Sequence, residues 1–258
     1  MHPYPEWFHI LAWLWLGVSF LSAFLILIDE LAHPQRMGIM NAVWPITGLY
    51  WGPVALWAYF RVGRKTTCQH QRAMQARMST EEMKQAKEKL KSEPPTRTQV
   101  AVAISHCGAG CTLGDITGEW WLFLMPLTFA GGELQTRLVI EFLLAWSFGV
   151  GFQYFTIAPM RGISGVKGIY AAVKADTVSI VAFQLGMSVW MALTYYIFFP
   201  GPHLHPNEAV FWFMMQIAML VGYFTSYPAN AWLLRKGWKE RMPEDPEAAR
   251  QLRDIEAA

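Results

Sequence analysis

The sequence predicts an all-α, polytopic transmembrane helix bundle of about six spans, with both termini in the cytoplasm. Three observations predict it. More than half of the 258 residues, 53%, are hydrophobic. Apolar runs long enough to cross a hydrocarbon core of about 30 Å recur along the chain. The Lys and Arg residues gather in alternate loops between those runs, as they do in membrane proteins of fixed orientation.

The first two apolar runs predict a transmembrane hairpin over residues 1–60. The run 7–28 is too long for the apolar core of a signal peptide, and no small-residue cleavage site follows it. We therefore expect it to stay in place as a helix. The run 37–60 contains two prolines, which membrane helices tolerate as kinks. A short turn, 29–36, is expected between the two runs.

The remaining chain divides into three parts. Segment 61–98 begins with basic residues and continues with Lys and Glu at helical spacing, so we expect a cytoplasmic linker with a solvated helix over 83–91. Residues 99–234 are expected to form a four-span core, in which the glycine-rich connector 162–175 could lie at the membrane interface. Residues 235–258 are expected to form a charged cytoplasmic tail.

Lysine and arginine residues set the predicted orientation. They concentrate in 61–98, in 162–175 and after residue 234, so these segments are expected in the cytoplasm. The three other loops contain a single basic residue, Arg36, and comprise 29–36, 130–133 and 200–208. Six crossings place every loop on its expected side. The basic stretch beside a span indicates a membrane surface, and no nucleic-acid partner is expected.

The third run, 99–127, carries the motif on which the functional hypotheses rest. Residues four apart share one face of a helix. One face carries small residues, which favour close packing between membrane helices. The other face carries two thiols and two carboxylates. The first face reads His106, Gly110, Gly114 and Gly118, and the second reads Cys107, Cys111, Asp115 and Glu119.

Two thiols four residues apart on a helix suit a soft metal ion such as Cu(I), Zn²⁺ or Hg²⁺. A charged side chain in the bilayer costs at least about 2.5 kcal/mol on the insertion scale, so it should face the bundle interior or a wet cavity. We therefore expect a copper-like metal site on this helix. Its expected ligands are His106, Cys107, Cys111, Asp115 and Glu119.

Acidic and imidazole side chains in the outer loops suggest where such an ion would enter. Two histidines separated by one residue resemble an access site, although an exposed histidine pair in a loop is more often incidental. The carboxylates after the first run equally suit a simple helix end. The set expected at the outer mouth is Asp29, Glu30, His33, His203, His205 and Glu208.

The motif also resembles a family signature. It reads Ser-His-Cys-Gly-x-Gly-Cys-Thr-x-Gly-Asp over 105–115, and Gly118-Glu119-Trp120 follows it. This pattern resembles that of an uncharacterised family of prokaryotic integral membrane proteins, classed as a domain of unknown function. The resemblance covers the membrane part from about residue 99 onward. It implies a shared helical bundle, and it implies no activity.

Three functions fit the sequence. The first is binding, with possible translocation, of a soft metal ion, for which no catalytic residue is expected. The second is a membrane thiol–disulfide oxidoreductase, whose two motif sulfurs would come within about 2.05 Å of each other when oxidised. The third is an accessory subunit of a larger membrane complex, or a homo-oligomer, whose Trp and Gly residues pack against neighbours. The expected environment is the lipid bilayer of the inner (cytoplasmic) membrane.

Overall fold

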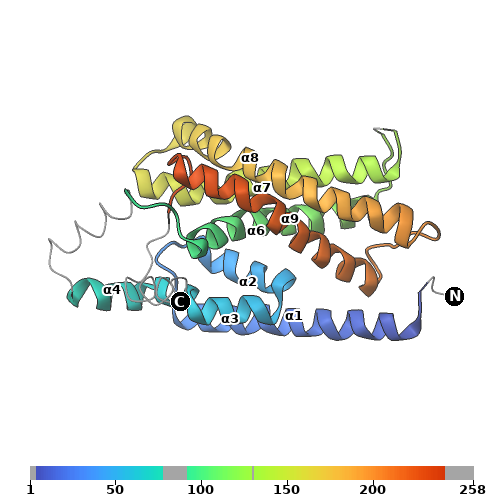
Figure 1. Ribbon diagram of the computed structural model, residues 1–258, viewed down its shortest axis with the longest axis horizontal. Coiled ribbons are helices and arrows are strands. Elements are labelled where there is room, and N and C mark those ends of the chain that lie inside the picture. The colour runs from blue at the N-terminus through green and yellow to red at the C-terminus, as the bar shows by residue number, and fades with distance from the viewer. Residues whose placement is uncertain (1–3, 78–91, 130, 242–258) are drawn as a thin grey trace.

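The computed structural model describes residues 4–77, 92–129 and 131–241, and these residues confirm the predicted all-α fold. Its long helices are α1 (Glu6–Ala32), α6 (Arg97–Leu124), α7 (Glu133–Arg161), α8 (Gly165–Leu193) and α9 (Ala209–Arg235). Its shorter helices are α2 (Met40–Trp51), α3 (Pro53–Arg61) and α4 (Cys68–Arg77) (Figure 1). The solvated helix expected over 83–91 lies outside the described residues.

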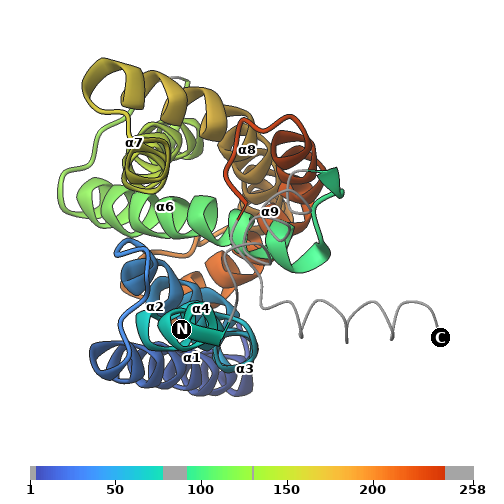
Figure 2. The same cartoon turned by 90° about the vertical axis from the view of Figure 1, so that its left-hand side faces the viewer.

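Four helices, α1, α7, α8 and α9, are long and apolar enough to cross a membrane. The chain is therefore a multi-pass membrane protein. Helix α6 has 28 residues, which is long enough to cross, but its polar motif keeps it below that degree of apolarity. Viewed end-on, α1 to α4 form one group and α6 to α9 form another (Figure 2). The connector 162–175 is mostly the first turns of α8, not a separate interfacial helix.

The second apolar run does not form a continuous span. At Gly52 the backbone has φ +53°, which glycine adopts without strain, and Pro53 then starts α3. A Cβ atom at Gly52 would lie 2.9 Å from Ser19 Oγ, so a side chain has no room there. Helices α2 and α3 have 12 and 9 residues. They are about 18 Å and 14 Å long, and neither can cross a core of about 30 Å.

The α2–α3 hairpin begins and ends at the same end of the bundle. Gln35, before α2, forms an isolated antiparallel bridge with Thr67, after α3. Arg64 Nη1 lies 2.6 Å from Asp29 Oδ1, and the Tyr59 hydroxyl donates to Asp29 Oδ2 at 2.8 Å. The prediction that 29–36 and 61–67 lie on opposite sides of the membrane is therefore wrong, because the chain reverses at Gly52.

The long helices begin and end at two well-separated ends of the bundle. Helices α1 and α9 start together, since the rings of Phe8 and Phe213 meet edge to face with centroids 5.6 Å apart. Arg161, at the end of α7, reaches Glu240 beyond α9 at 2.5 Å. The start of α1 and the end of α9 thus lie at opposite ends (Figure 1). The expected shared side for both termini does not fit this arrangement.

The two ends differ in charge. We call the end where α1, α3, α7 and α9 finish the basic end, and the opposite end the acidic end. The basic residues of the first include Arg36, Arg61, Arg64, Lys65, Arg161, Lys167, Lys174, Arg235 and Lys236, and the same end also holds the acids Asp29, Glu30 and Glu240. The connecting segments of the acidic end carry Glu133 and Glu208. Because the α2–α3 hairpin returns to the end at which it starts, the loop 29–36 also lies at the basic end.

We expect single cysteines introduced at Arg36 and Arg61 to react from one side of the membrane, and a cysteine at Asn207 from the other. The first two positions are exposed at the basic end, whereas Asn207 is exposed at the acidic end. A membrane-impermeant maleimide applied to sealed vesicles of both orientations, in a Cys68→Ser background, measures this. Labelling of the Arg36 and Arg61 positions from opposite sides of the membrane would contradict this expectation and support the two-span hairpin predicted for residues 1–60.

Helix α6 packs backbone to backbone against α7. A Cβ atom at Gly110 would lie 2.7 Å from Gly149 Cα, and one at Gly114 would lie 2.6 Å from Ala145 Cα. Approaches this close between helices require small residues on both sides. The predicted small-residue face is therefore confirmed, and its partner is α7 of the same chain. This contact fixes the rotation of α6 and turns the thiol and carboxylate face toward the other helices.

Candidate functional site

The motif helix is anchored at the basic end by a capping box. The Thr96 side chain accepts a hydrogen bond from Gln99 N at 3.2 Å, and the Gln99 side chain accepts one from Thr96 N at 3.2 Å. All of the expected ligands on α6 are at most 4% exposed: His106, Cys107, Cys111, Asp115 and Glu119.

These five side chains do not form one site. Twelve residues separate Cys107 from Glu119, which is about 18 Å along the helix axis. Among the residues that the structure describes, no three His, Cys, Asp or Glu side chains gather closely enough to hold a metal ion. The side chains instead belong to two polar groups, a thiol–lysine cluster near the basic end and a carboxylate cluster nearer the acidic end.

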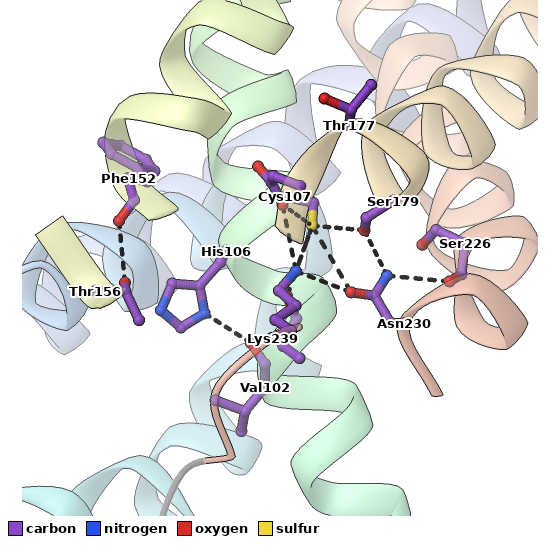
Figure 3. Close-up of polar contacts among 12 residues, drawn as sticks. Val102, His106, Cys107, Phe152, Thr156, Thr177, Ser179, Ser226, Asn230 and Lys239 are labelled. Carbon is purple, nitrogen blue, oxygen red and sulfur yellow. Dashed lines mark hydrogen bonds and ion pairs between the residues drawn. The ribbon is translucent and has the colours of Figure 1, made fainter. Parts of the chain in front are cut away.

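The thiol–lysine cluster consists of Cys107, Asp176, Ser179, Asn230 and Lys239, and its centre is an ammonium. Lys239 Nζ lies 2.9 Å from Cys107 Sγ, 2.9 Å from Asn230 Oδ1 and 3.3 Å from Asp176 Oδ1. Cys107 Sγ also lies 2.8 Å from Ser179 Oγ. The Asn230 amide donates to that same hydroxyl oxygen at 2.6 Å (Figure 3). No member is more than 3% exposed.

The segment after α9 carries Lys239 back into the bundle. At Gly237 the backbone has φ +65°, and the Trp238 N–H bonds back to the last turn of α9 at 3.1 Å. The Lys174 ammonium lies 4.0 Å from the centre of the Trp238 ring. We call residues 236–241 the C-terminal strap. The described start of the expected cytoplasmic tail is thus part of the core.

The charge on Lys239 follows from its surroundings. Burial by itself would lower the pKa of the ammonium, but the Cys107 sulfur and the Asp176 carboxylate raise the pKa above its ordinary value. The side chain therefore stays protonated. The role of Lys239 could not be predicted, because the charged segment 235–258 has the composition of a solvated tail. Asp176 lies 11 residues inside α8, well beyond its first turn. A buried acid in a span predicts a cationic partner.

The carboxylate cluster consists of Asp115, Glu119 and Glu141, and Arg137 is the cation beside its two glutamates. Arg137 Nη1 lies 3.2 Å from Glu119 Oε2, and Arg137 Nη2 lies 3.0 Å from Glu133 Oε1. Arg137 thus contacts these two acids directly, and it interacts with Glu141 electrostatically. Glu141 is 3% exposed and interacts electrostatically with Glu119. Several buried acids therefore depend on one guanidinium.

Cys111 and His106 stand apart from both clusters. Cys111 is fully buried and lies within electrostatic range of Cys107 and Asp115. Both motif thiols are free. His106 Nδ1 lies 3.1 Å from the Val102 carbonyl oxygen, and its ring turns away from the Cys107 sulfur (Figure 3). Its Nε2 is buried without a hydrogen-bond partner.

The residues expected at one outer mouth are divided between the two ends. Tyr4, just before α1, meets Phe199 with ring centroids 6.1 Å apart, at the acidic end. Asp29 lies 25 residues further along α1, roughly 38 Å away. Asp29, Glu30 and His33 therefore lie at the basic end, and the acidic end holds His203, His205 and Glu208.

The two loop histidines contact aromatic rings. The His203 ring stacks on Tyr195 with centroids 3.5 Å apart. His205 lies near Phe123, with ring centroids 6.4 Å apart. These contacts give each imidazole a packing role of its own. The expected access site is therefore not assembled as one set of ligands, because α1 runs from the acidic end to the basic end and carries Asp29, Glu30 and His33 there.

Comparison with known proteins concerns the second group of helices. A family described as a domain of unknown function, DUF4396, matches residues 96–239. The chain belongs to this family. The matched region begins at the cap of α6 and ends at Lys239, so it spans every member of the thiol–lysine cluster. No curated protein and no solved structure matches the chain.

Proposed function

We propose that this DUF4396 protein binds a cation inside the membrane, at the thiol–lysine cluster, and that the ion is a thiophilic divalent cation of the Zn²⁺ class. One observation carries the proposal: acceptor atoms from α6, α8 and α9 converge on a single buried ammonium. These atoms are Cys107 Sγ, Asp176 Oδ1 and Asn230 Oδ1. A pocket that holds a tethered ammonium already has the charge and the donors of a cation site.

Charge balance favours a divalent ion. While Cys107 is a neutral thiol, the Lys239 ammonium balances the ionised Asp176 carboxylate. Once the thiol is deprotonated, Cys107 and Asp176 together supply two negative charges. Zn²⁺ neutralises both, and thiolate and carboxylate oxygen are among its usual ligands. The Ser179 hydroxyl or the Asn230 carbonyl oxygen lies close enough to contribute. Binding releases the thiol proton and requires the ammonium to withdraw, so the C-terminal strap would move when the ion binds.

The donor set also decides between metals. Cu(I), the ion favoured by the sequence, prefers several thiolate or thioether ligands. The described contacts of Cys107 are to oxygen and nitrogen atoms of its neighbours and do not include Cys111. A single thiol among oxygen donors suits a borderline ion better. Asp115 and Glu119, further along α6, would then line the way to the site from the acidic end, as a translocation route requires.

The fold also supports a specific membrane orientation. We propose crossings by α1, α6, α7, α8 and α9, in place of the expected six, with the basic end in the cytoplasm of a cell bounded by an inner membrane. The concentration of Lys and Arg at that end supports this orientation. The α2–α3 hairpin then enters and leaves the bilayer on the cytoplasmic side, and the start of α1 lies outside. Of the two polar clusters, the thiol–lysine cluster then lies nearer to the cytoplasm.

Zn²⁺ binding to the purified, detergent-solubilised protein tests the proposal. We expect one ion per chain, measured by titration calorimetry and by metal analysis after desalting. Cys107→Ser should remove this binding. Lys239→Met should raise the affinity at least tenfold, because it removes the competing ammonium. Cys111→Ser is the matched control, since it makes the same change at an equally buried position of α6 and should keep the ion.

Two results would overturn the proposal: loss of the ion from Cys111→Ser as well as from Cys107→Ser, or an unchanged affinity in Lys239→Met. The same preparation tests the other two functions. An oxidoreductase would lose two free thiols on mild oxidation as Cys107 and Cys111 pair. An accessory subunit would purify with a stoichiometric partner and without bound ion.

A further inference from the structure

A cavity of about 540 Å³ lies between α1, α2, α6 and α9, separate from the thiol–lysine cluster. Its volume is typical of small-molecule sites. Its wall is mainly aromatic and aliphatic. The aromatic side chains that line it are Trp13, Phe20, Tyr50, Trp120 and Trp212.

Unpartnered polar atoms occur in this apolar wall. Asp115 is 1% exposed, and neither of its carboxylate oxygens has a hydrogen-bond partner. The Gln184 amide lies beside the Asp115 carboxylate, within reach of a hydrogen bond, but its Nε2 lacks good hydrogen-bond geometry to any acceptor. The Tyr50 hydroxyl and Gln216 Oε1 are likewise buried in the wall without partners. Nearly all buried polar groups in folded proteins are paired, so these atoms are candidates to bind a ligand.

The wall would attract positive charge. The acceptors in it include the Asp115 and Glu208 carboxylates, and no Lys or Arg is among its described lining residues. The Gln216 amide already donates to the Leu49 carbonyl, which leaves the carbonyl oxygen of Gln216 for a donor. Tryptophan faces attract cations, more strongly where water is excluded.

Part of the cavity's rim lies on surfaces of α1 and α6 that the proposed crossings expose to lipid. Its rim residues Trp13, Phe20 and Trp120 have 58%, 63% and 38% of their surface exposed, on helices that face the hydrocarbon. A ligand that reaches such an opening must dissolve in the bilayer. We propose that this cavity binds an amphiphilic organic monocation, with its ammonium group at Asp115 and its apolar body against the tryptophans.

A matched pair of ligands tests this proposal. The cation 4-phenylbutylammonium and the neutral 4-phenylbutan-1-ol differ only in the polar group. In titration calorimetry of the detergent-solubilised protein, we expect the ammonium to bind at least ten times more tightly than the alcohol. Asp115→Asn should abolish this preference. Glu133→Gln should retain it, because it makes the same charge change at the acidic end but outside the cavity.

A second variant keeps the test decisive if Asp115→Asn fails to fold. Ile116 lines the cavity and is half-buried, so Ile116→Trp should fill it and weaken both ligands at least tenfold. Equal affinity of the native protein for the amine and the alcohol would overturn the proposal and leave an apolar cleft for lipid chains. A preference that survives in Asp115→Asn, or binding unaffected by Ile116→Trp, would overturn it as well. Zn²⁺ binding is scored separately and does not enter this result.

Discussion

Gly114→Leu is expected to abolish recovery of the folded protein. The first added atom would already lie 2.6 Å from Ala145 Cα, and the helix backbones cannot separate without disrupting the whole α6–α7 contact. Inserting methylene groups into a well-packed core usually costs about 1–3 kcal/mol, and this contact involves backbone, which cannot choose another rotamer. Monodisperse yield in size-exclusion chromatography, together with the melting temperature, measures the effect.

Gly17→Leu is the matched control for this substitution. It makes the same change in another membrane helix, α1, where an added Cβ would meet no atom within 4 Å. We expect near-native yield and melting temperature for this variant. Equal behaviour of the two leucine variants, whether both fold or both fail, would show that the α6–α7 contact is not the cause.

Lys239→Met is expected to destabilise the protein strongly in the absence of metal. The change leaves the Cys107 sulfur and the Asp176 carboxylate buried without the ammonium that now contacts both. Removing one partner of a buried ion pair typically costs about 3–5 kcal/mol. For a chain of this size that corresponds to a fall in melting temperature of roughly 10 °C. Methionine retains much of the length of the lysine side chain, so packing changes little.

Lys236→Met provides the comparison, because Lys236 is in the same strap but exposed. It should leave the melting temperature unchanged. Adding Zn²⁺ should recover more stability in Lys239→Met than in the native protein, since the ion then enters a site without a competitor. An unaltered melting temperature in Lys239→Met would show that the ammonium does not neutralise the cluster.

The long helices could be predicted from the sequence because each follows from a local apolar run of sufficient length. The α2–α3 hairpin could not. A kinked span and a helical hairpin have the same composition, and the difference lies in the backbone at Gly52 and the packing of Ser19 against it. Charge counting did not resolve this point, because the loop 29–36 contains only one basic residue.

Only the α6 residues of the candidate site could be predicted from the sequence. Helical spacing correctly placed Cys107 and its neighbours inside the bundle, since a buried face repeats locally. The partners of Cys107 lie far away in the chain, because Asp176, Asn230 and Lys239 are 69, 123 and 132 positions from it. Such pairings depend on how α8, α9 and the strap pack together. A single sequence contains no local signal for that packing.

The polarity of α6 has a consequence for how the chain is made. Of the long helices that the structure describes, α6 alone is not apolar enough to cross a membrane by itself. When it emerges from the ribosome, its polar face has no partner, and transfer into lipid is unfavourable. Helix α7, which follows, supplies the surface for the small-residue face of α6 and, through Arg137, a cationic partner for Glu119. The two helices should therefore leave the translocation machinery as a pair, so that α6 waits for synthesis of α7 before it enters the bilayer.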